Sequence, residues 1–227
     1  MFNDLLIQRS NYLGYQLTMQ ENDNHGWVGG SAPQWFEDKE HLLTDESQLK
    51  YGFFLSVKLP VSNQMVSIFI PELAEAYSHA AYPCGIKAIV HPVSPESASG
   101  LAVLMPEKPD PAQKLTKYQR QFDYSLPVLK KAYIAPPVTY EAGEREFEDF
   151  IQFGGQPAWV QQEEKYYANQ LLDEGYEYIM QVNEDQYLPD MVHGNYPFYF
   201  GALYLYGKTQ TENEELTDLI AAFWQNS

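Results

Sequence analysis

The sequence predicts an α+β fold in which two duplicated, sheet-rich halves form one body with peripheral helices. A Gly-Gly motif occurs twice, as Trp27-Val-Gly-Gly-Ser-Ala-Pro-Gln-Trp35 and as Phe153-Gly-Gly-Gln-Pro-Ala-Trp159. An apolar run follows each motif, and the interval from Tyr51 to Tyr176 equals the interval between the first glycines of the two motifs. Aromatic residues, which suit pleated and half-buried surfaces, make up 15% of the chain. This self-similarity indicates that a supersecondary unit has been duplicated.

We expect a single domain over residues 1–227, because a chain of 227 residues can bury a substantial core. The related halves are expected at about 22–110 and 147–227, joined by a bridging segment at 111–146. The proline-rich stretch Pro106-Glu-Lys-Pro-Asp-Pro111 is the clearest break in the pattern and ends the first half.

In the first half, the apolar runs at 53–59 and 65–70 are expected to be paired strands, because Pro60-Val-Ser-Asn63 between them is typical of a turn. Pro71 suits the first position of a helix and predicts one at 72–81. The remaining expected elements are a short helix or lead-in strand at 2–13, a loop or one short helix at 38–50, and strands at 85–93 and 101–105.

In the second half, the segment 212–224 is predicted to be a helix, because its apolar residues recur at helical spacing and acids occupy its first turn. These apolar residues are Leu216, Leu219, Ile220 and Phe223. The other expected elements are helices at 112–122 and 144–151, a strand at 128–134, and paired strands at 176–182 and 198–206. The polar segment 161–174 carries no predicted element.

The second motif resembles the YwqG-like family of bacterial proteins, whose function is unassigned. The resemblance rests on Phe153-Gly-Gly-Gln-Pro-Ala-Trp-Val-Gln161 and on Tyr178-Ile-Met-Gln-Val-Asn183. It is weaker over 27–59, and His193-Gly-Asn-Tyr-Pro197 replaces the acidic, glycine-rich step that precedes the last strand in the family. The resemblance implies an α+β fold with two related sheet-rich halves. Some family members are thought to serve as immunity proteins beside polymorphic toxins.

The charge pattern favours a basic protein partner over nucleic acid or a membrane. The net charge is −17, and acidic side chains far outnumber basic ones in residues 132–227. We therefore expect a non-enzymatic, immunity-type binding protein that neutralises a basic partner, such as a toxin encoded nearby. The expected contacts are the acids Glu144, Glu146, Glu148, Asp149, Glu184 and Asp185, with Tyr187 and Tyr196 as aromatic anchors. The bland interpretation is that this acidity only keeps an aromatic-rich protein soluble.

No pattern predicts a catalytic residue, a metal site or a cofactor. The histidines, at positions 25, 41, 79, 91 and 193, show no metal-ligand spacing, and the two Gly-Gly pairs are too short for a nucleotide loop. Cys84 is the single cysteine, the N-terminus lacks the pattern of a signal peptide, and no apolar run approaches the roughly 20 residues of a membrane span. We expect a cytoplasmic location, and an enzyme is the less favoured class.

The alternative function is binding or hydrolysis of a carbohydrate or another small ligand in a cleft between the halves. Trp159 could stack on a sugar ring, although its recurrence beside Gly-Gly favours a packing role. Gln181 interrupts an apolar strand and needs a hydrogen-bond partner, and we expect that partner to be the backbone of the neighbouring Gly-Gly turn. The cleft candidates are Trp159, Gln161, Gln181 and His193.

Overall fold

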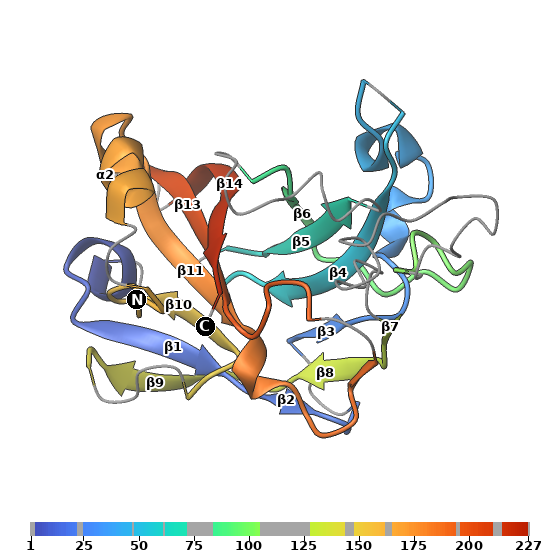
Figure 1. The fold of residues 1–227 in the computed structure, drawn as a ribbon, viewed down its shortest axis with the longest axis horizontal. Helices are drawn as coiled ribbons and strands as arrows, with labels where there is room; N and C mark the ends of the chain where they lie inside the picture. The colour runs from blue at the N-terminus through green and yellow to red at the C-terminus, as the bar shows by residue number, and fades with distance from the viewer. Residues whose placement is uncertain are drawn as a thin grey trace, which may run out of the picture.

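The computed structural model describes residues 3–21, 25–46, 48–60, 62–71, 84–104, 128–143, 148–161, 165–193, 196–210 and 215–226. Its main features are two six-stranded antiparallel sheets, which confirm the predicted sheet-rich architecture (Figure 1). The N-terminal sheet has the order β2 (Leu17–Thr18), β8 (Ala132–Ile134), β3 (Gly26–Val28), β4 (Tyr51–Lys58), β5 (Gln64–Pro71), β6 (Lys87–Pro92). The C-terminal sheet has the order β9 (Val138–Glu141), β1 (Asn11–Tyr15), β10 (Ile151–Gly154), β11 (Glu177–Asn183), β13 (Ala202–Gln210), β14 (Glu215–Gln225).

The remaining elements are short. The strands β7 (Val128–Leu129) and β12 (Val192–His193) form a two-stranded sheet. One α-helix, α2 (Lys165–Asp173), occurs in the part of the chain that the structure describes. The single-turn helices are the π-helical turn η1 (Asn3–Ile7) and the 3₁₀ turns η2 (Gln34–Phe36), η3 (Glu40–Leu43) and η6 (Glu184–Gln186).

The inner faces of the two sheets meet in one apolar cluster. Val57 and Ile68 of the N-terminal sheet and Val182 and Leu203 of the C-terminal sheet belong to it, and all are fully or almost fully buried. Two smaller clusters cover the outer faces, one around Phe69 and one around the tyrosines and Phe223 of β11, β13 and β14. Because both faces of each sheet are covered, the central strands are buried at nearly every position.

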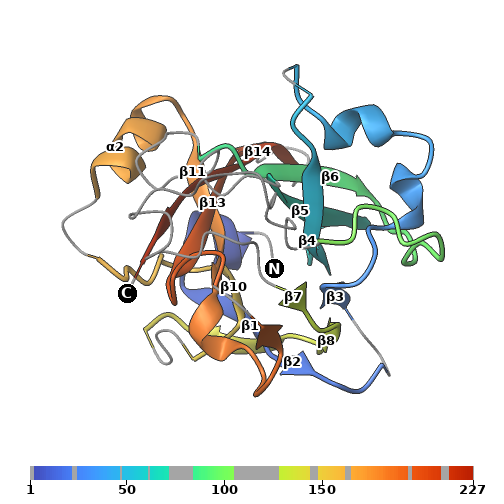
Figure 2. The ribbon, with the colours of Figure 1, turned by 45° about the vertical axis from the view of Figure 1, so that its right-hand side comes forward.

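Each outer face is covered by the segment that follows a Gly-Gly motif. Phe36 of η2 packs edge-on against Phe69 of β5, at 4.9 Å between ring centroids, on the outside of the N-terminal sheet. Trp159 stacks on Tyr204 of β13, at 5.2 Å, on the outside of the C-terminal sheet, where α2 also lies (Figure 2). The motifs therefore begin the two outer layers of the molecule.

The two sheets do not follow the predicted boundaries of the halves at 22–110, 111–146 and 147–227. Four strands of each half do lie side by side in chain order, as β3-β4-β5-β6 and as β10-β11-β13-β14, and of the described strands only the short β12 of the two-stranded sheet intervenes in the chain. However, the N-terminal strand β1 lies in the C-terminal sheet, between β9 and β10. The bridging segment supplies β8 to one sheet and β9 to the other. The segments outside these two sets of four strands therefore tie the two sheets together.

The predicted helix at 212–224 is wrong over the residues described, because Glu215–Gln225 forms the strand β14. Its pairing with β13 changes register between Tyr204 and Leu205 and again between Tyr206 and Lys208. These irregularities break the two-residue alternation, so Leu216 and Leu219 both reach the inner cluster although they are three residues apart. A bulged strand with both faces covered therefore imitates helical spacing.

Of the other predicted strands and helices, some are confirmed by the structure and others are wrong. The strand pairs β4–β5 and β11–β13 and the strand β6 are confirmed, although β13 begins at Ala202. The predicted helix at 144–151 is wrong at its C-terminal end, which the structure describes and where Ile151 begins β10. The predicted strand at 101–105 is, over its described residues, a turn with one isolated bridge at Val103. The predicted strand at 128–134 is split into β7 and β8, and α2 lies in the segment 161–174, for which the sequence predicts no element. The helices expected at 72–81 and 112–122 lie outside the described residues.

Candidate functional site

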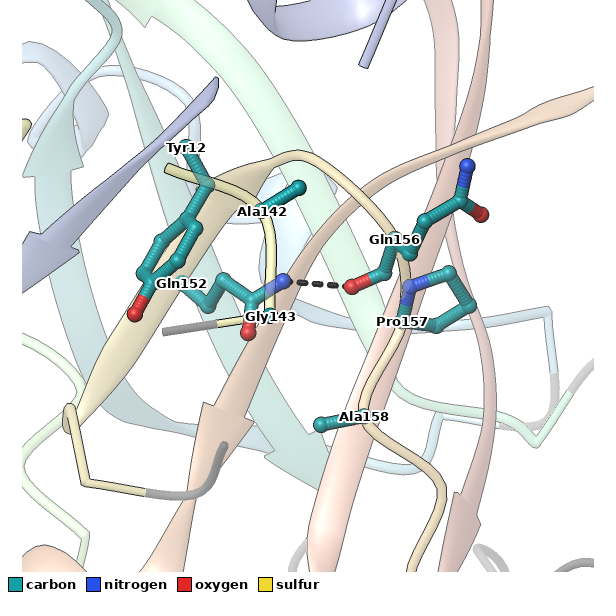
Figure 3. Close-up of a pocket in the computed structure, with 7 residues that line it drawn as sticks. All are labelled: Tyr12, Ala142, Gly143, Gln152, Gln156, Pro157 and Ala158. Carbon is teal, nitrogen blue, oxygen red and sulfur yellow. Dashed lines mark hydrogen bonds between the residues drawn. The ribbon is translucent and has the colours of Figure 1, made fainter. Parts of the chain in front are cut away.

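The two Gly-Gly turns have closely similar geometry. All four glycines have positive φ, between 65° and 78°, which side chains other than glycine adopt at a cost. In the first turn the indole Nε1 of Trp27 donates to the carbonyl of Ser31, at 2.9 Å. In the second turn the amide Nε2 of Gln152 donates to the carbonyl of Gln156, at 2.6 Å (Figure 3). The donor and acceptor are four residues apart in both turns.

A hollow of about 270 Å³ lies beside the second turn. Its lining residues come from β1, from the end of β9, from β10 and from the segment after Gly-Gly. They are Tyr12, Ala142, Gly143, Gln152, Gln156, Pro157 and Ala158 (Figure 3). Among the described residues, the polar atoms of this lining belong to amide and phenol groups and to the backbone, and none belongs to a charged side chain.

Gln181 lies fully buried next to this hollow and makes the contact that the sequence predicted. Its Oε1 accepts from the backbone N–H of Ala158 at 2.8 Å, which confirms the turn segment as its partner. Its Nε2 donates to Oδ1 of Asn183, also at 2.8 Å. The hydroxyl of Tyr204 donates to the carbonyl of Ala158, at 2.8 Å. This buried polar row fixes the segment after the second Gly-Gly pair onto the sheet.

The other cleft candidates are only partly brought together. Trp159 is half-buried, and it stacks on Tyr204 and Phe223. Gln161 bonds to Gln225 through both backbone atoms, so it closes the same outer layer. His193 is exposed on β12, in the separate two-stranded sheet. Trp159, Gln161 and Gln181 all lie on the outside of the C-terminal sheet. They do not line a cleft between the halves, because the inner faces of the two sheets meet in the apolar cluster.

The predicted acidic surface is corrected at two positions. Asp149 is 2% exposed and Glu184 is fully buried, so neither belongs to a surface that a partner could contact in this conformation. Glu148 and Asp185 are exposed, as a contact surface requires. Glu144 and Glu146 lie outside the described residues. The sequence alone could not separate Glu184 from its neighbour Asp185, because burial here depends on the packing of distant residues.

The buried carboxyl of Glu184 holds the turn at 198–200. Its Oε2 accepts from the backbone N–H groups of Phe198, at 2.8 Å, and Phe200, at 3.1 Å. Its Oε1 accepts from the hydroxyl of Tyr187 at 3.4 Å. Burial raises the pKa of this carboxyl well above its ordinary value, against the opposing effect of these hydrogen bonds. The side chain is therefore a buried anchor.

The anchored turn presents aromatic rings to solvent. Tyr199 is 40% exposed and Phe200 is 51% exposed, and both have positive φ, 50° and 64°. Tyr196 stacks on Phe200 with 4.0 Å between centroids, and it contacts Tyr187 at 5.6 Å. Tyr199 stacks on Trp224 at 5.7 Å. We call Tyr187, Tyr196, Tyr199 and Phe200 the aromatic turn.

The structure thus brings together the two predicted anchors, Tyr187 and Tyr196, and adds two that the sequence analysis missed. The sequence predicts Tyr199 and Phe200 to lie in the strand at 198–206, whereas the structure places them in the turn that precedes β13. The aromatic run Tyr196-Pro-Phe-Tyr-Phe200, closed by Gly201, is the signal that could have indicated a turn. Positive φ is rare for bulky residues, and two such residues in succession mark a strained turn.

The other nucleophilic and titratable side chains singled out by the sequence are buried or dispersed where the structure describes them. Cys84 is buried, and burial raises the pKa of its thiol to about 12. Burial lowers the pKa of His91, whose Nε2 lies 2.7 Å from the hydroxyl of Ser67. Among the described residues, no cluster of three or more His, Cys, Asp or Glu side chains could hold a metal ion. No helix in the same part of the chain is long and apolar enough to cross a membrane.

Comparison of this chain with protein-family models, with curated proteins and with solved structures finds no match.

Proposed function

We propose that this chain is a non-enzymatic, immunity-type binding protein that recognises a basic protein partner, such as a toxin encoded nearby, through the aromatic turn and the acids around it. The observation that carries the proposal is the anchored, exposed aromatic turn. Exposed tyrosine and phenylalanine rings supply contact area with little loss of side-chain entropy, and aromatic residues dominate the energetics of many interfaces. Because Glu184 already fixes the turn, binding would not have to order it.

Charge supplies the second argument. The chain carries a net charge of −17, and Asp185 and Asp190 are exposed in the segment that leads to the aromatic turn. A negative surface steers a basic partner toward it and raises the association rate, and lysine or arginine side chains can then lie over the exposed rings. The partner that fits is therefore a protein with a basic face.

The test is binding of candidate basic proteins, starting with the products of neighbouring genes, to matched variants. Phe200→Ala together with Tyr199→Ala should weaken binding by about tenfold or more, since each is proposed as a hot-spot ring. The matched control is Tyr166→Ala on α2, where an aromatic ring is 72% exposed but remote in sequence from the aromatic turn. This control should bind as the unaltered protein does.

Charge reversal separates steering from contact. Asp185→Lys should slow association and flatten its dependence on salt, with a smaller effect on dissociation. Asp173→Lys, an exposed acid at the end of α2, is the control with the same change in net charge. If the association rate loses its salt dependence to the same extent in both variants, the net charge of the protein, and not the position of Asp185, causes the steering. Unchanged binding in the double aromatic variant would overturn the proposed surface.

The proposal includes a cytoplasmic location, membership of the YwqG-like family and an origin of the two sheets by duplication. Two matching features support the last point. Each half has four strands side by side in chain order, and each set of four has a Gly-Gly turn after its first strand with a hydrogen bond from a side chain to the carbonyl four residues on. The single cysteine agrees with a reducing compartment.

The second candidate function is binding of a small ligand, such as a carbohydrate. The observation that favours it is the hollow beside Gln152, Gln156 and Tyr12. The hollow lies within the C-terminal sheet layer and not between the halves. Its lining, as far as the structure describes this part of the chain, contains no carboxylate pair for hydrolysis. Thermal-shift screening of small ligands tests this candidate, because a ligand that binds the native state alone raises its stability.

A further inference from the structure

The two Gly-Gly turns can be compared residue by residue, because they end equivalent strands. Gly154 at the end of β10 pairs with Tyr12 of β1. In the other sheet, β3 pairs with β8 from Gly26 to Val28, and continuing that register by one residue places Lys131 beside Gly29. Lys131 and Tyr12 therefore occupy equivalent positions next to the two turns.

The first turn binds a carboxylate from its own chain. Oε1 of Glu96 accepts from the backbone N–H of Ser31, at 2.9 Å, and Oε2 forms an ion pair with Nζ of Lys131. A Cβ atom on Gly30 would lie 2.6 Å from Oε1 of Glu96, so only glycine leaves room for the carboxylate. Backbone N–H groups in turns can form concave surfaces that bind anions, and the N–H of Ser31, which follows two glycines with positive φ, acts in this way.

At the second turn, the residue equivalent to Ser31 is Gln156, and it lines the hollow. The two residues have the same backbone role, since the carbonyl of each accepts from the side chain four residues before it. Within the described part of the chain, the backbone N–H of Gln156 has no hydrogen-bond acceptor. The atoms nearest to a Cβ placed on Gly155 are in Tyr12, Asn11 and Gln152, and none belongs to a carboxylate.

We propose that the hollow at the second Gly-Gly turn is a binding site for a carboxylate group, which accepts from the backbone N–H of Gln156 as Glu96 accepts from Ser31. The volume of about 270 Å³ accommodates a small carboxylic acid or the end of a peptide. The ring of Tyr12 and the ring of Pro157 supply apolar contact to the part of the ligand next to the carboxylate.

The differences between the turns define how this site should behave. Tyr12 stands where the first turn has Lys131, so this position supplies no ion pair to the ligand, and the affinity should be lower than for a site with one. The acidic chain repels free anions over long distances, and salt screens this repulsion. Carboxylate affinity should therefore rise as inert salt is added, opposite to the expected salt dependence of a basic partner at the aromatic turn.

The test is an amide NMR titration of the full-length protein with sodium acetate, against sodium chloride at equal ionic strength. The Gln156 amide should shift saturably, and acetamide should shift it about fivefold less at the same concentration, because a charged acceptor forms the stronger bond. N-acetyl-dialanine and its C-terminal amide distinguish the sources of the carboxylate. A stronger response to the peptide acid than to acetate points to a peptide terminus, and the reverse order points to a free small acid.

Two variants keep the test decisive. Glu96→Ala empties the first turn, so the Ser31 amide, unresponsive in the unaltered protein, should begin to respond to acetate. Ala142→Phe places a large side chain at the exposed rim of the hollow and should abolish the Gln156 response while Ser31 is unchanged. A Ser31 response in Glu96→Ala together with an unmoved Gln156 amide would overturn the proposal. Phe200→Ala should leave both responses intact, so failure of this site and failure of the aromatic turn are separate results.

Discussion

Glu184 offers the sharpest test of how the aromatic turn is held. In Glu184→Ala, the backbone N–H of Phe198 becomes a buried donor without an acceptor, and the partly buried N–H of Phe200 loses the same acceptor. A buried unsatisfied donor costs about 1–3 kcal/mol, and the more accessible one costs less, so we expect a loss of about 2–4 kcal/mol in the free energy of unfolding. For a chain of this size that corresponds to a fall of about 4–16 °C in melting temperature.

Glu184→Gln is the matched variant, because its amide oxygen can still accept from both N–H groups. The raised pKa means that the folded protein holds this proton at pH values where the unfolded chain, with its ordinary value of 4.5, has released it. The contribution of Glu184 to stability is therefore present below pH 4.5 and is lost as the pH rises through the raised folded-state pKa. Glutamine does not titrate, so its melting temperature relative to the unaltered protein should increase with pH.

The assay is differential scanning calorimetry from pH 4 to pH 9, with Asp185→Asn as the exposed control. The control should stay within about 0.5 kcal/mol of the unaltered protein. A Glu184→Ala variant as stable as the control would refute the anchoring role of the carboxyl. A constant difference between Glu184→Gln and the unaltered protein over the whole pH range would refute the raised pKa.

Three further expectations follow from buried groups and from the second turn. Gln181→Leu should lower the free energy of unfolding by about 1–3 kcal/mol, since the buried N–H of Ala158 loses its acceptor, and chemical denaturation measures this. Gly155→Ala should destabilise the protein more than Gly143→Ala in the same assay. Both glycines have positive φ, but a Cβ atom on Gly155 would also lie 2.9 Å from the Cβ atom of Tyr12. Equal effects of the two substitutions would contradict this close approach. Cys84 should resist a thiol reagent at pH 8 in the native state and react after unfolding, and rapid native labelling would show that its burial is not maintained.

The elements predicted correctly are those whose signal is local. The strands β4 and β5 are two long apolar runs separated by a polar turn, and no distant contact is needed to recognise such a hairpin. The same holds for β11 and for the Gly-Gly turns, whose glycines have the positive φ that repeated glycine pairs indicate. The requirement of Gln181 for a buried partner also followed from its place in an apolar run.

The wrong predictions share a different cause. The helical spacing in β14 arises from bulges in its pairing with β13, and a bulge depends on two strands at once. The position of β1 in the C-terminal sheet likewise depends on its pairing with β10, which lies more than a hundred residues further along the chain.

The sequence by itself determined the sheet-rich class, the repeated Gly-Gly turns and the acidic charge, because each is a property of neighbouring residues or of composition. Only the tertiary structure decided which acids are accessible: Glu184 is buried while Asp185 is exposed. It also decided that Tyr199 and Phe200 belong to a strained surface turn, and that a hollow lies at one Gly-Gly turn where Glu96 fills the other. The physical reason is that burial and strain are set by what packs against a residue, and those neighbours come from distant parts of the chain.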